Sequence, residues 1–207
     1  MIHTLNEFSV SFAYRHRETT WLIHRTGKDT PIARLRKPEA PDSLKPYQVY
    51  GGPRLDELLG HVANSIALAV DGRRLGRVRL RSKQWELRGG GLSTDEEWTF
   101  AQDGLEALQG RPTGLGSRAR HAAVLGNVMD NVLTDVVLPH SLRYRGSTSE
   151  GFELTRRAGV HSRYDVRVHD PRINRLLVLS AVAYFESEHG DADVRKILPS
   201  IGGLFRL

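Results

Sequence analysis

The residues of this chain best suited to binding chemistry are basic side chains gathered in one short segment. Between positions 73 and 88 there are seven arginines and lysines and a single acid, Glu86, so the segment carries a surplus equal to the whole chain's net charge of +6. Guanidinium groups make forked hydrogen bonds with phosphate and carboxylate oxygens. The segment therefore predicts a polyanion-binding site, made of Arg73, Arg77, Arg79, Arg81 and Lys83.

Three of these arginines, Arg77, Arg79 and Arg81, occupy every second position of "GRVRLR". Alternate residues of a β-strand point to the same face and lie about 6.6–6.8 Å apart. This spacing suits contacts with neighbouring phosphates or lipid head groups. A solvated outer face of a sheet has the same pattern, so the spacing alone leaves both interpretations open.

A second group of arginines lies further along the chain but has acids among its members. The arginines are Arg143, Arg145, Arg156, Arg157, Arg163 and Arg167, and the acids are Glu150, Glu153 and Asp165. Because opposite charges in one region offset each other, we expect this group to be a solvated structural surface.

No residue pattern typical of catalysis is found. The glycine-rich segments "GGGLSTDEEW" and "GRPTGLGSRA" lack the lysine of phosphate-binding loops, and the chain has no Gly-x-Ser-x-Gly, no His-Glu-x-x-His and no cysteine. We therefore expect no enzyme, no catalytic residue and no cofactor. The enzymatic alternative is a metal-dependent hydrolase or nuclease built from scattered acids, with Asp71 and Glu86 as candidates.

The histidines and the clustered acids have no clear catalytic spacing either. His169 stands beside Asp170, with His161 eight residues earlier, but neighbouring strand residues point to opposite faces. We therefore expect no metal site there. The acidic run from Asp95 to Glu97 follows three glycines, and we expect it at a loop tip.

Composition places the chain among ordinary globular proteins. Hydrophobic residues make up 39% and charged residues 26% of 207 residues, which suits a single domain spanning 1–207. The absence of cysteine excludes disulfides and fits a reducing compartment. The opening residues carry charge where a secretory signal needs an unbroken apolar core. We therefore expect a cytoplasmic protein, with peripheral contact to the inner membrane face.

Periodicity predicts mainly strands in the first half of the chain. Residues 8–14 alternate between apolar and polar or small side chains, and "TTWLIHR" is the expected neighbouring strand. Residues 65–100 are expected to form hairpins, with a tight turn at Asp71-Gly72. Five of the nine prolines lie between Pro31 and Pro53, which predicts a surface excursion and not a central strand. The segment "PRLDELLGHV" that begins at Pro53 is predicted to be a short helix.

The second half is predicted to combine strands and two helices. Apolar pairs recur every four residues over 122–137, which favours a helix. Three strands follow Pro139: "SLRYRG", "GFELTRR" and "SRYDVRVHD". Asp170 is then the expected N-cap of a second helix, with Pro171 at its first position.

That second helix is apolar on every side from Leu176 to Phe185, yet too short to span a membrane. Exposing even half of its large side chains would cost on the order of 5–10 kcal/mol, so it must be surrounded by other elements. A closed antiparallel β-barrel enclosing a hydrophobic C-terminal helix is the simplest solution. The alternative is a helix between a sheet and other helices.

Taken together, these features resemble the Tubby C-terminal-like superfamily, especially its phospholipid scramblase and LURP-one-related branch. The resemblance rests on the late strand before an Asp-Pro junction, the hydrophobic helix that runs into acidic residues and the earlier "GRRLGRV" hairpin. It implies a barrel of about twelve strands around a C-terminal helix. The cysteine cluster and acidic calcium loop of eukaryotic scramblases have no counterpart in this sequence, so calcium-driven scrambling is not implied.

The sequence as a whole therefore predicts a non-catalytic binding or membrane-peripheral module that recognises anionic lipid head groups or another polyanion. The alternatives are a nucleic-acid-binding protein and, less favoured, the metal-dependent hydrolase. Residues 191–207 carry apolar side chains at helical spacing and end on apolar residues. We expect this tail to dock against the barrel, a membrane surface or a partner subunit in a homo-oligomer.

Overall fold

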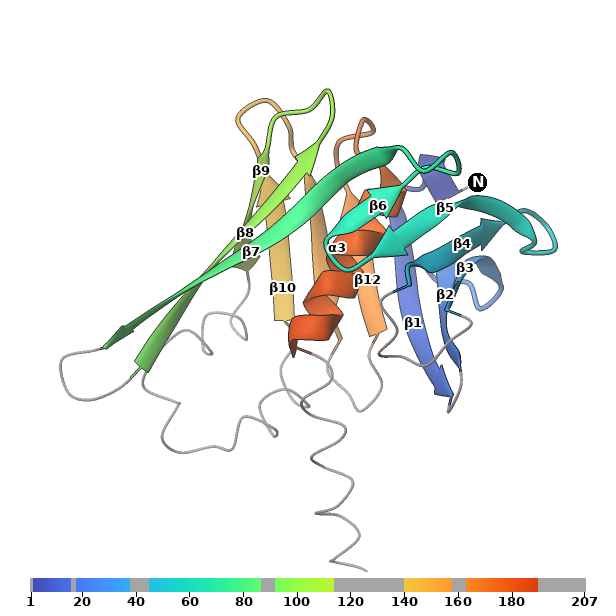
Figure 1. The fold of residues 1–207 in the computed structure, drawn as a ribbon, viewed down its shortest axis with the longest axis horizontal. Helices are drawn as coiled ribbons and strands as arrows, with labels where there is room; N and C mark the ends of the chain where they lie inside the picture. The colour runs from blue at the N-terminus through green and yellow to red at the C-terminus, as the bar shows by residue number, and fades with distance from the viewer. Residues whose placement is uncertain are drawn as a thin grey trace, which may run out of the picture.

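In the computed structural model the chain forms a closed, twelve-stranded antiparallel β-barrel with one helix packed against the sheet (Figure 1). The structure describes residues 2–15, 18–37, 45–86, 92–113, 140–157 and 163–189. Each strand pairs with its neighbours in the chain, and the first strand closes the barrel against the last. The mainly β architecture predicted from the sequence is confirmed.

The barrel is preceded by a short 3-10 turn and followed by the helix. The turn is η1 (Ile2–Thr4) and the helix is α3 (Arg175–His189). The strands are β1 (Glu7–Arg15), β2 (Glu18–Arg25), β3 (Pro31–Lys37), β4 (Tyr47–Gly51), β5 (Glu57–Ala63), β6 (Ile66–Leu68), β7 (Arg74–Glu86), β8 (Leu92–Gln102), β9 (Leu108–Thr113), β10 (His140–Arg145), β11 (Phe152–Arg156) and β12 (Arg163–Val168).

Helix α3 lies among the inner faces of the strands. Leu177, Leu179 and Phe185 are fully buried. The helix packs against β5, β6 and β7, and its aromatic rings contact rings of β8, β10 and β12. Strands from most of the circumference therefore cover the apolar helix, as its sequence predicted. No helix in the described part of the chain has the length and apolar character to cross a bilayer.

The start of α3 differs from the prediction. The helix begins at Arg175, and the side chain of Asn174 accepts hydrogen bonds from the N–H groups of Leu176 and Leu177 at 2.9 and 3.4 Å. Asn174 is therefore the N-cap. Asp170 instead accepts the backbone N–H of Arg172 at 3.0 Å, in a turn before the helix.

Two predictions for the first half of the chain are wrong. The proline-rich stretch supplies strands β3 and β4. These strands tolerate the prolines because Pro31 is the first residue of β3 and Pro46 directly precedes β4, where proline removes no ladder donor. The predicted helix from Pro53 is strand β5. A β-bulge on β5 places Gly60 opposite Val49 but Leu58 opposite Tyr50. The extra residue turned an alternating pattern into one that resembled helical spacing.

Other parts of the prediction are confirmed or fall outside the described residues. The tight turn at Asp71-Gly72 is present, with the Gly72 N–H donating to the carbonyl of Ala69 at 3.0 Å. The hairpins expected over residues 65–100 include one long strand, β7, of 13 residues, and β9 had not been expected. The helix predicted over 122–137 and the tail 191–207 lie outside the described residues.

Two polar residues of α3 contact backbone groups of the barrel wall. The Ser180 hydroxyl donates to the carbonyl of Ala63, the last residue of β5, at 2.8 Å. One helical turn later, burial raises the pKa of Tyr184 while a hydrogen bond with the Leu80 backbone of β7 opposes that rise. Ser180 and Tyr184 therefore bind backbone groups on either side of β6, the shortest strand.

Glycines let the helix approach the wall closely. Gly60 and Gly76 have φ of +147° and +152°, and both lie beside leucines of α3. A Cβ at Gly76 would lie 2.5 Å from the Leu177 Cδ2 and would also press on the Ala101 carbonyl oxygen. A larger residue at either position would force the helix away from the sheet.

The buried environment of α3 predicts that Leu179→Arg abolishes soluble folding. Leu179 has no exposed surface, so arginine would place an unpaired charge in the core, at a cost of several kcal/mol. Glu188→Arg, at an exposed position of the same helix, is the control. Soluble yield and thermal unfolding measure both variants. A Leu179→Arg protein with the parent's melting temperature would contradict the enclosed helix.

The close approach at Gly76 predicts that Gly76→Ala lowers the free energy of unfolding by about 3 kcal/mol or more, from backbone strain and overpacking together. Gly72→Ala is a matched control, because Gly72 also has a positive φ but nothing within 4 Å of its Cβ position. This control should lose only about 1–2 kcal/mol in the same urea titration. Equal losses for the two variants would show that the helix contact is unimportant.

Candidate functional site

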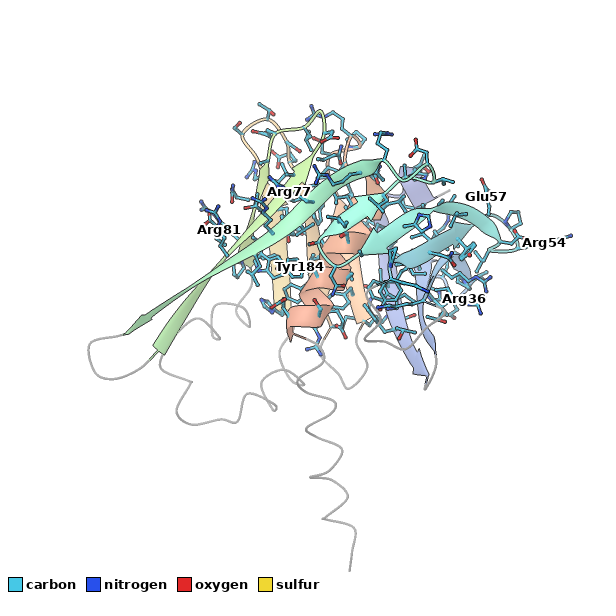
Figure 2. The ribbon with its side chains drawn as sticks, in the orientation of Figure 1. Arg36, Arg54, Glu57, Arg77, Arg81 and Tyr184 are labelled. Carbon is cyan, nitrogen blue, oxygen red and sulfur yellow. The ribbon has the colours of Figure 1, made fainter. Side chains whose placement is uncertain are left out.

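The three arginines predicted to share a strand face do so. Arg77, Arg79 and Arg81 are exposed on β7, while Val78 between them is buried. Figure 2 shows Arg77 and Arg81 on this strand. The three arginines line a groove of about 270 Å³, which we call the basic groove. Its other lining residues come from β8 and from the chain leading into and along β9: Glu97, Thr99, Ala101, Ala107 and Gln109.

The arginines of the basic groove have no partner within the described part of the chain. Arg77, Arg79 and Arg81 make no ion pair and no hydrogen bond with any side chain that the structure describes. Across the ladder they face Ala101, Thr99 and Glu97, so one cross-strand neighbour of the three is acidic. Their guanidinium groups are therefore available to an external anion.

The second arginine group shows the opposite behaviour. Arg143 forms an ion pair with Glu153 at 2.9 Å, and Arg145 pairs with Glu150 at 2.7 Å. Further round the barrel, Arg157 pairs with Asp165 at 2.6 Å and Arg167 with Glu7 at 2.8 Å. Arg156 is buried. Four of the six arginines of this group therefore have carboxylate partners, whereas Arg163 is exposed and forms no ion pair within the described part of the chain.

The remaining predicted site residues separate. Arg73 lies in the turn before β7 and lines a different pocket, beside Arg172 and the start of α3. Lys83 continues the register of the three arginines on β7, opposite Asp95. Asp95 and Glu97 are strand residues of β8, so the expected loop tip is wrong. We placed these acids at a loop tip because they follow three glycines, and the sequence does not show that the β7–β8 ladder continues as far as Leu92.

The candidates for metal-dependent chemistry are not brought together. Asp71 precedes β7 and Glu86 ends it, and a strand of 13 residues separates such positions by roughly 40 Å. His169 lies 3.8 Å from Glu153, and His161 lies outside the described residues. Within the described ranges no three histidine or carboxylate side chains gather where they could hold a metal ion.

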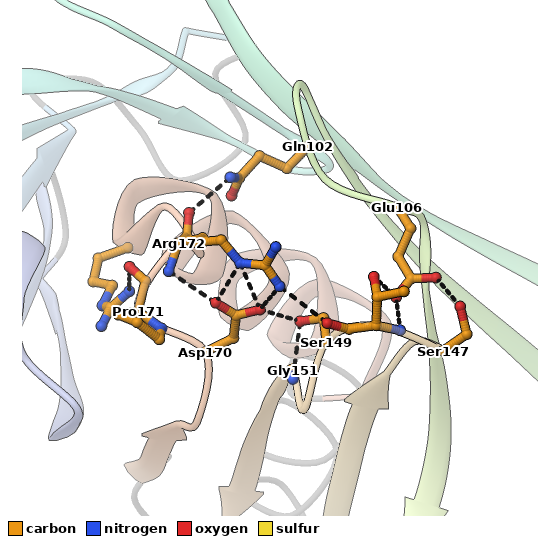
Figure 3. A network of polar contacts seen from close by, with 10 residues as sticks. Gln102, Glu106, Ser147, Ser149, Gly151, Asp170, Pro171 and Arg172 are labelled. Atoms are coloured by element: carbon orange, nitrogen blue, oxygen red, sulfur yellow. Dashed lines mark hydrogen bonds and ion pairs between the residues drawn. The ribbon is translucent and has the colours of Figure 1, made fainter.

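A polar network that sequence reasoning missed ties three loops together at one end of the barrel (Figure 3). The carboxylate of Glu106 accepts hydrogen bonds from the Ser147 hydroxyl at 2.6 Å, the Thr148 hydroxyl at 2.7 Å and the Thr148 N–H. These contacts join the β8–β9 loop to the β10–β11 loop. They hold the pKa of Glu106 down, from 4.5 to about 2.

The same network reaches the start of α3. Asp170 accepts hydrogen bonds from Arg172 at 2.6 Å and from the Ser149 hydroxyl at 2.6 Å. The hydrogen bond from Arg172 is the main reason that the pKa of Asp170 is well below its usual range. Arg172 also donates to the carbonyl of Thr148 at 3.0 Å. We call Glu106, Ser147, Thr148, Ser149, Asp170 and Arg172 the rim network.

The charged groups of the rim network are hydrogen-bonded within the protein. Its carboxylates accept donors from neighbouring loops, and its arginine is bound to a carboxylate and a carbonyl. The network therefore fixes the loops at this end of the barrel and leaves the basic groove on β7 as the candidate site. Sequence spacing gave no signal for it, because Glu106 and Thr148 are 42 residues apart.

The rim network predicts a pH-dependent contribution from Glu106. Because its folded pKa lies below the ordinary value, its carboxylate stabilises the fold above about pH 4.5, and this contribution is lost as the pH falls toward about 2. Glu106→Gln should therefore lower the melting temperature by a few degrees at neutral pH, and the difference from the parent should shrink on acidification. Glu57→Gln, at an exposed position of β5, is the control. A Glu106→Gln deficit that is the same at all pH values would contradict this role of the carboxylate.

No family model, no curated protein and no solved structure matches this chain.

Proposed function

We propose that this chain is a non-catalytic binding module whose basic groove recognises anionic phosphate groups, first among them the head groups of anionic lipids at a membrane surface. The observation that carries the proposal is that Arg77, Arg79 and Arg81 are exposed and unpaired, whereas most arginines of the second group have carboxylate partners. A protein surface that neutralises one arginine group and leaves another free favours an external anion at the free one.

The neighbours of the basic groove suit such a ligand. Thr99 and Gln109 add neutral hydrogen-bonding groups to the three guanidinium groups. The three arginines of the groove are exposed on the outside of the barrel, so a charged surface can reach them without entering the protein. Forked contacts from arginines about 6.6–6.8 Å apart on one strand can engage adjacent phosphates.

Apolar side chains beside the groove favour a lipid surface over nucleic acid. Ile66 and Leu68, half-buried on β6, face Arg77 and Arg74 across the ladder. Val70, in the turn before β7, is 55% exposed, and no other large hydrophobic residue in the described part of the chain is exposed. Apolar side chains next to arginines suit the boundary between head groups and acyl chains. The barrel around a helix, expected from the resemblance to the Tubby C-terminal-like superfamily, also supports this choice.

The proposal predicts that reversing Arg77, Arg79 and Arg81 to glutamate leaves the fold intact but weakens binding to vesicles containing phosphatidylserine by about a hundredfold at low salt. Binding by the parent should fall as salt increases, because exposed charges are screened. Vesicle sedimentation measures the binding, and thermal unfolding checks the fold. Phosphatidylcholine vesicles supply the uncharged surface.

The matched control reverses three arginines that already have partners, Arg145, Arg157 and Arg167. It makes the same change in net charge on another part of the barrel, and should weaken binding much less. Equal weakening by the two triple variants would show that only net charge matters and would contradict a site at the basic groove. Binding to single-stranded DNA without binding to the vesicles would favour the nucleic-acid alternative.

A further inference from the structure

The hairpin of β7 and β8 extends beyond its partners on either side. The two strands pair over eleven positions, from Gly76–Gln102 to Glu86–Leu92. On its other side, β7 pairs with β6 only as far as Arg77, and β8 pairs with β9 only from Trp98 onward. Figure 1 shows the outer part of this hairpin projecting from the barrel wall.

The projecting part of β7 has an open edge. Beyond Arg77 no described strand pairs with β7 on the side of β6. The N–H of Val78 donates to the carbonyl of Ser65 at 2.7 Å, so the backbone groups of Val78 point to that side. Backbone direction alternates along a strand, so those of Leu80, Ser82 and Gln84 point the same way. Tyr184 contacts the Leu80 backbone. From Ser82 onward, no described part of the chain pairs with this edge.

An open edge is a template for another strand, and its side chains decide which strand can add. Arg81 is exposed on the outer face at the start of this edge, and Lys83 continues its register along β7. A second copy that paired its own β7 symmetrically about Ser82 would place Arg81 opposite Lys83, and like charges directly opposite are destabilising. An acidic strand would instead place carboxylates beside them.

We propose that the open edge of β7, from Ser82 to Glu86, binds an extended acidic segment of another protein by β-strand addition. The backbone of the partner forms ladder hydrogen bonds with the backbone groups of Ser82 and Gln84, and its acidic side chains lie beside the positions of Arg81 and Lys83. This site goes beyond the basic groove, because it depends on backbone groups that phosphate recognition does not use.

The probe is an acetylated peptide of alternating glutamate and valine, about six residues long, which matches a typical strand. Two N-methylated versions separate strand addition from charge attraction. One is methylated on the alternate residues whose N–H groups would face β7, and the other on the remaining residues. Both keep the same charge. Calorimetry with the full-length protein should show that the first modification weakens binding at least about tenfold, while the second leaves it nearly unchanged.

A protein variant tests the same edge from the other side. Ser82→Pro removes an N–H that points away from β8, so the β7–β8 ladder is preserved. It should weaken peptide binding at least about tenfold, and its control, Ser82→Ala, should not. Vesicle binding by Ser82→Pro should equal that of the parent, so failure of the edge and failure of the basic groove are distinguishable.

Several results would overturn the inference. Equal binding of all three peptides would mean that charge alone attracts them, and no binding of any peptide would remove the edge as a site. Self-association of the parent, abolished by Ser82→Pro in light scattering, would make a second copy the occupant in place of an acidic partner.

Discussion

The enclosure of α3 is the constraint on which the rest of this structure depends. A helix that is apolar on every side has no face that water can cover, and the barrel supplies strands around it. The glycines of β5 and β7 serve this enclosure, since a Cβ at Gly60 or Gly76 would press on a leucine of α3. The polar residues Ser180 and Tyr184 complete the fit, because they bind backbone groups on both sides of the shortest strand. Even the position of the basic groove depends on the enclosure, since inward-facing Val78 forces its neighbours Arg77 and Arg79 outward.

The sequence predicted those parts of the fold that follow from simple periodicity. The alternation in residues 8–14 and the uniform hydrophobicity from Leu176 to Phe185 are direct consequences of which side chains are buried, so β1 and α3 were found. Segments with local exceptions were misread. Prolines at strand ends made β3 and β4 look like a loop, and the bulge at Leu59 gave β5 a helical spacing. The N-cap was assigned to Asp170 and not Asn174, because the sequence does not show that a turn stabilised by Arg172 intervenes.

Part of the candidate site was also predictable from periodicity. The shared face of Arg77, Arg79 and Arg81 follows from period two alone. Their lack of partners does not, because it depends on which residues β8 places opposite them, and periodicity does not reveal the register of β8. Register also explains why Arg73 was wrongly grouped with them: it precedes the strand and lies toward Arg172 and the start of α3. Thr99 and Gln109 carry no charge and no motif, so only their place across the ladder identifies them as groove residues.

Closure of the barrel has a consequence for how the protein is made. The first and last strands pair directly, with Glu7 opposite Arg167, and the buried guanidinium of Arg175 donates to the carbonyl of Leu5 at 2.8 Å. Contacts so distant in sequence carry a greater loss of chain entropy than the hairpins between neighbouring strands, so we expect barrel closure to form after those hairpins. Since α3 follows every described strand in the chain, the ribosome releases these strands before the helix. Until the helix emerges, the inner faces of the strands lack the apolar surface that covers them in the folded protein, and chaperones can bind the nascent chain in that interval.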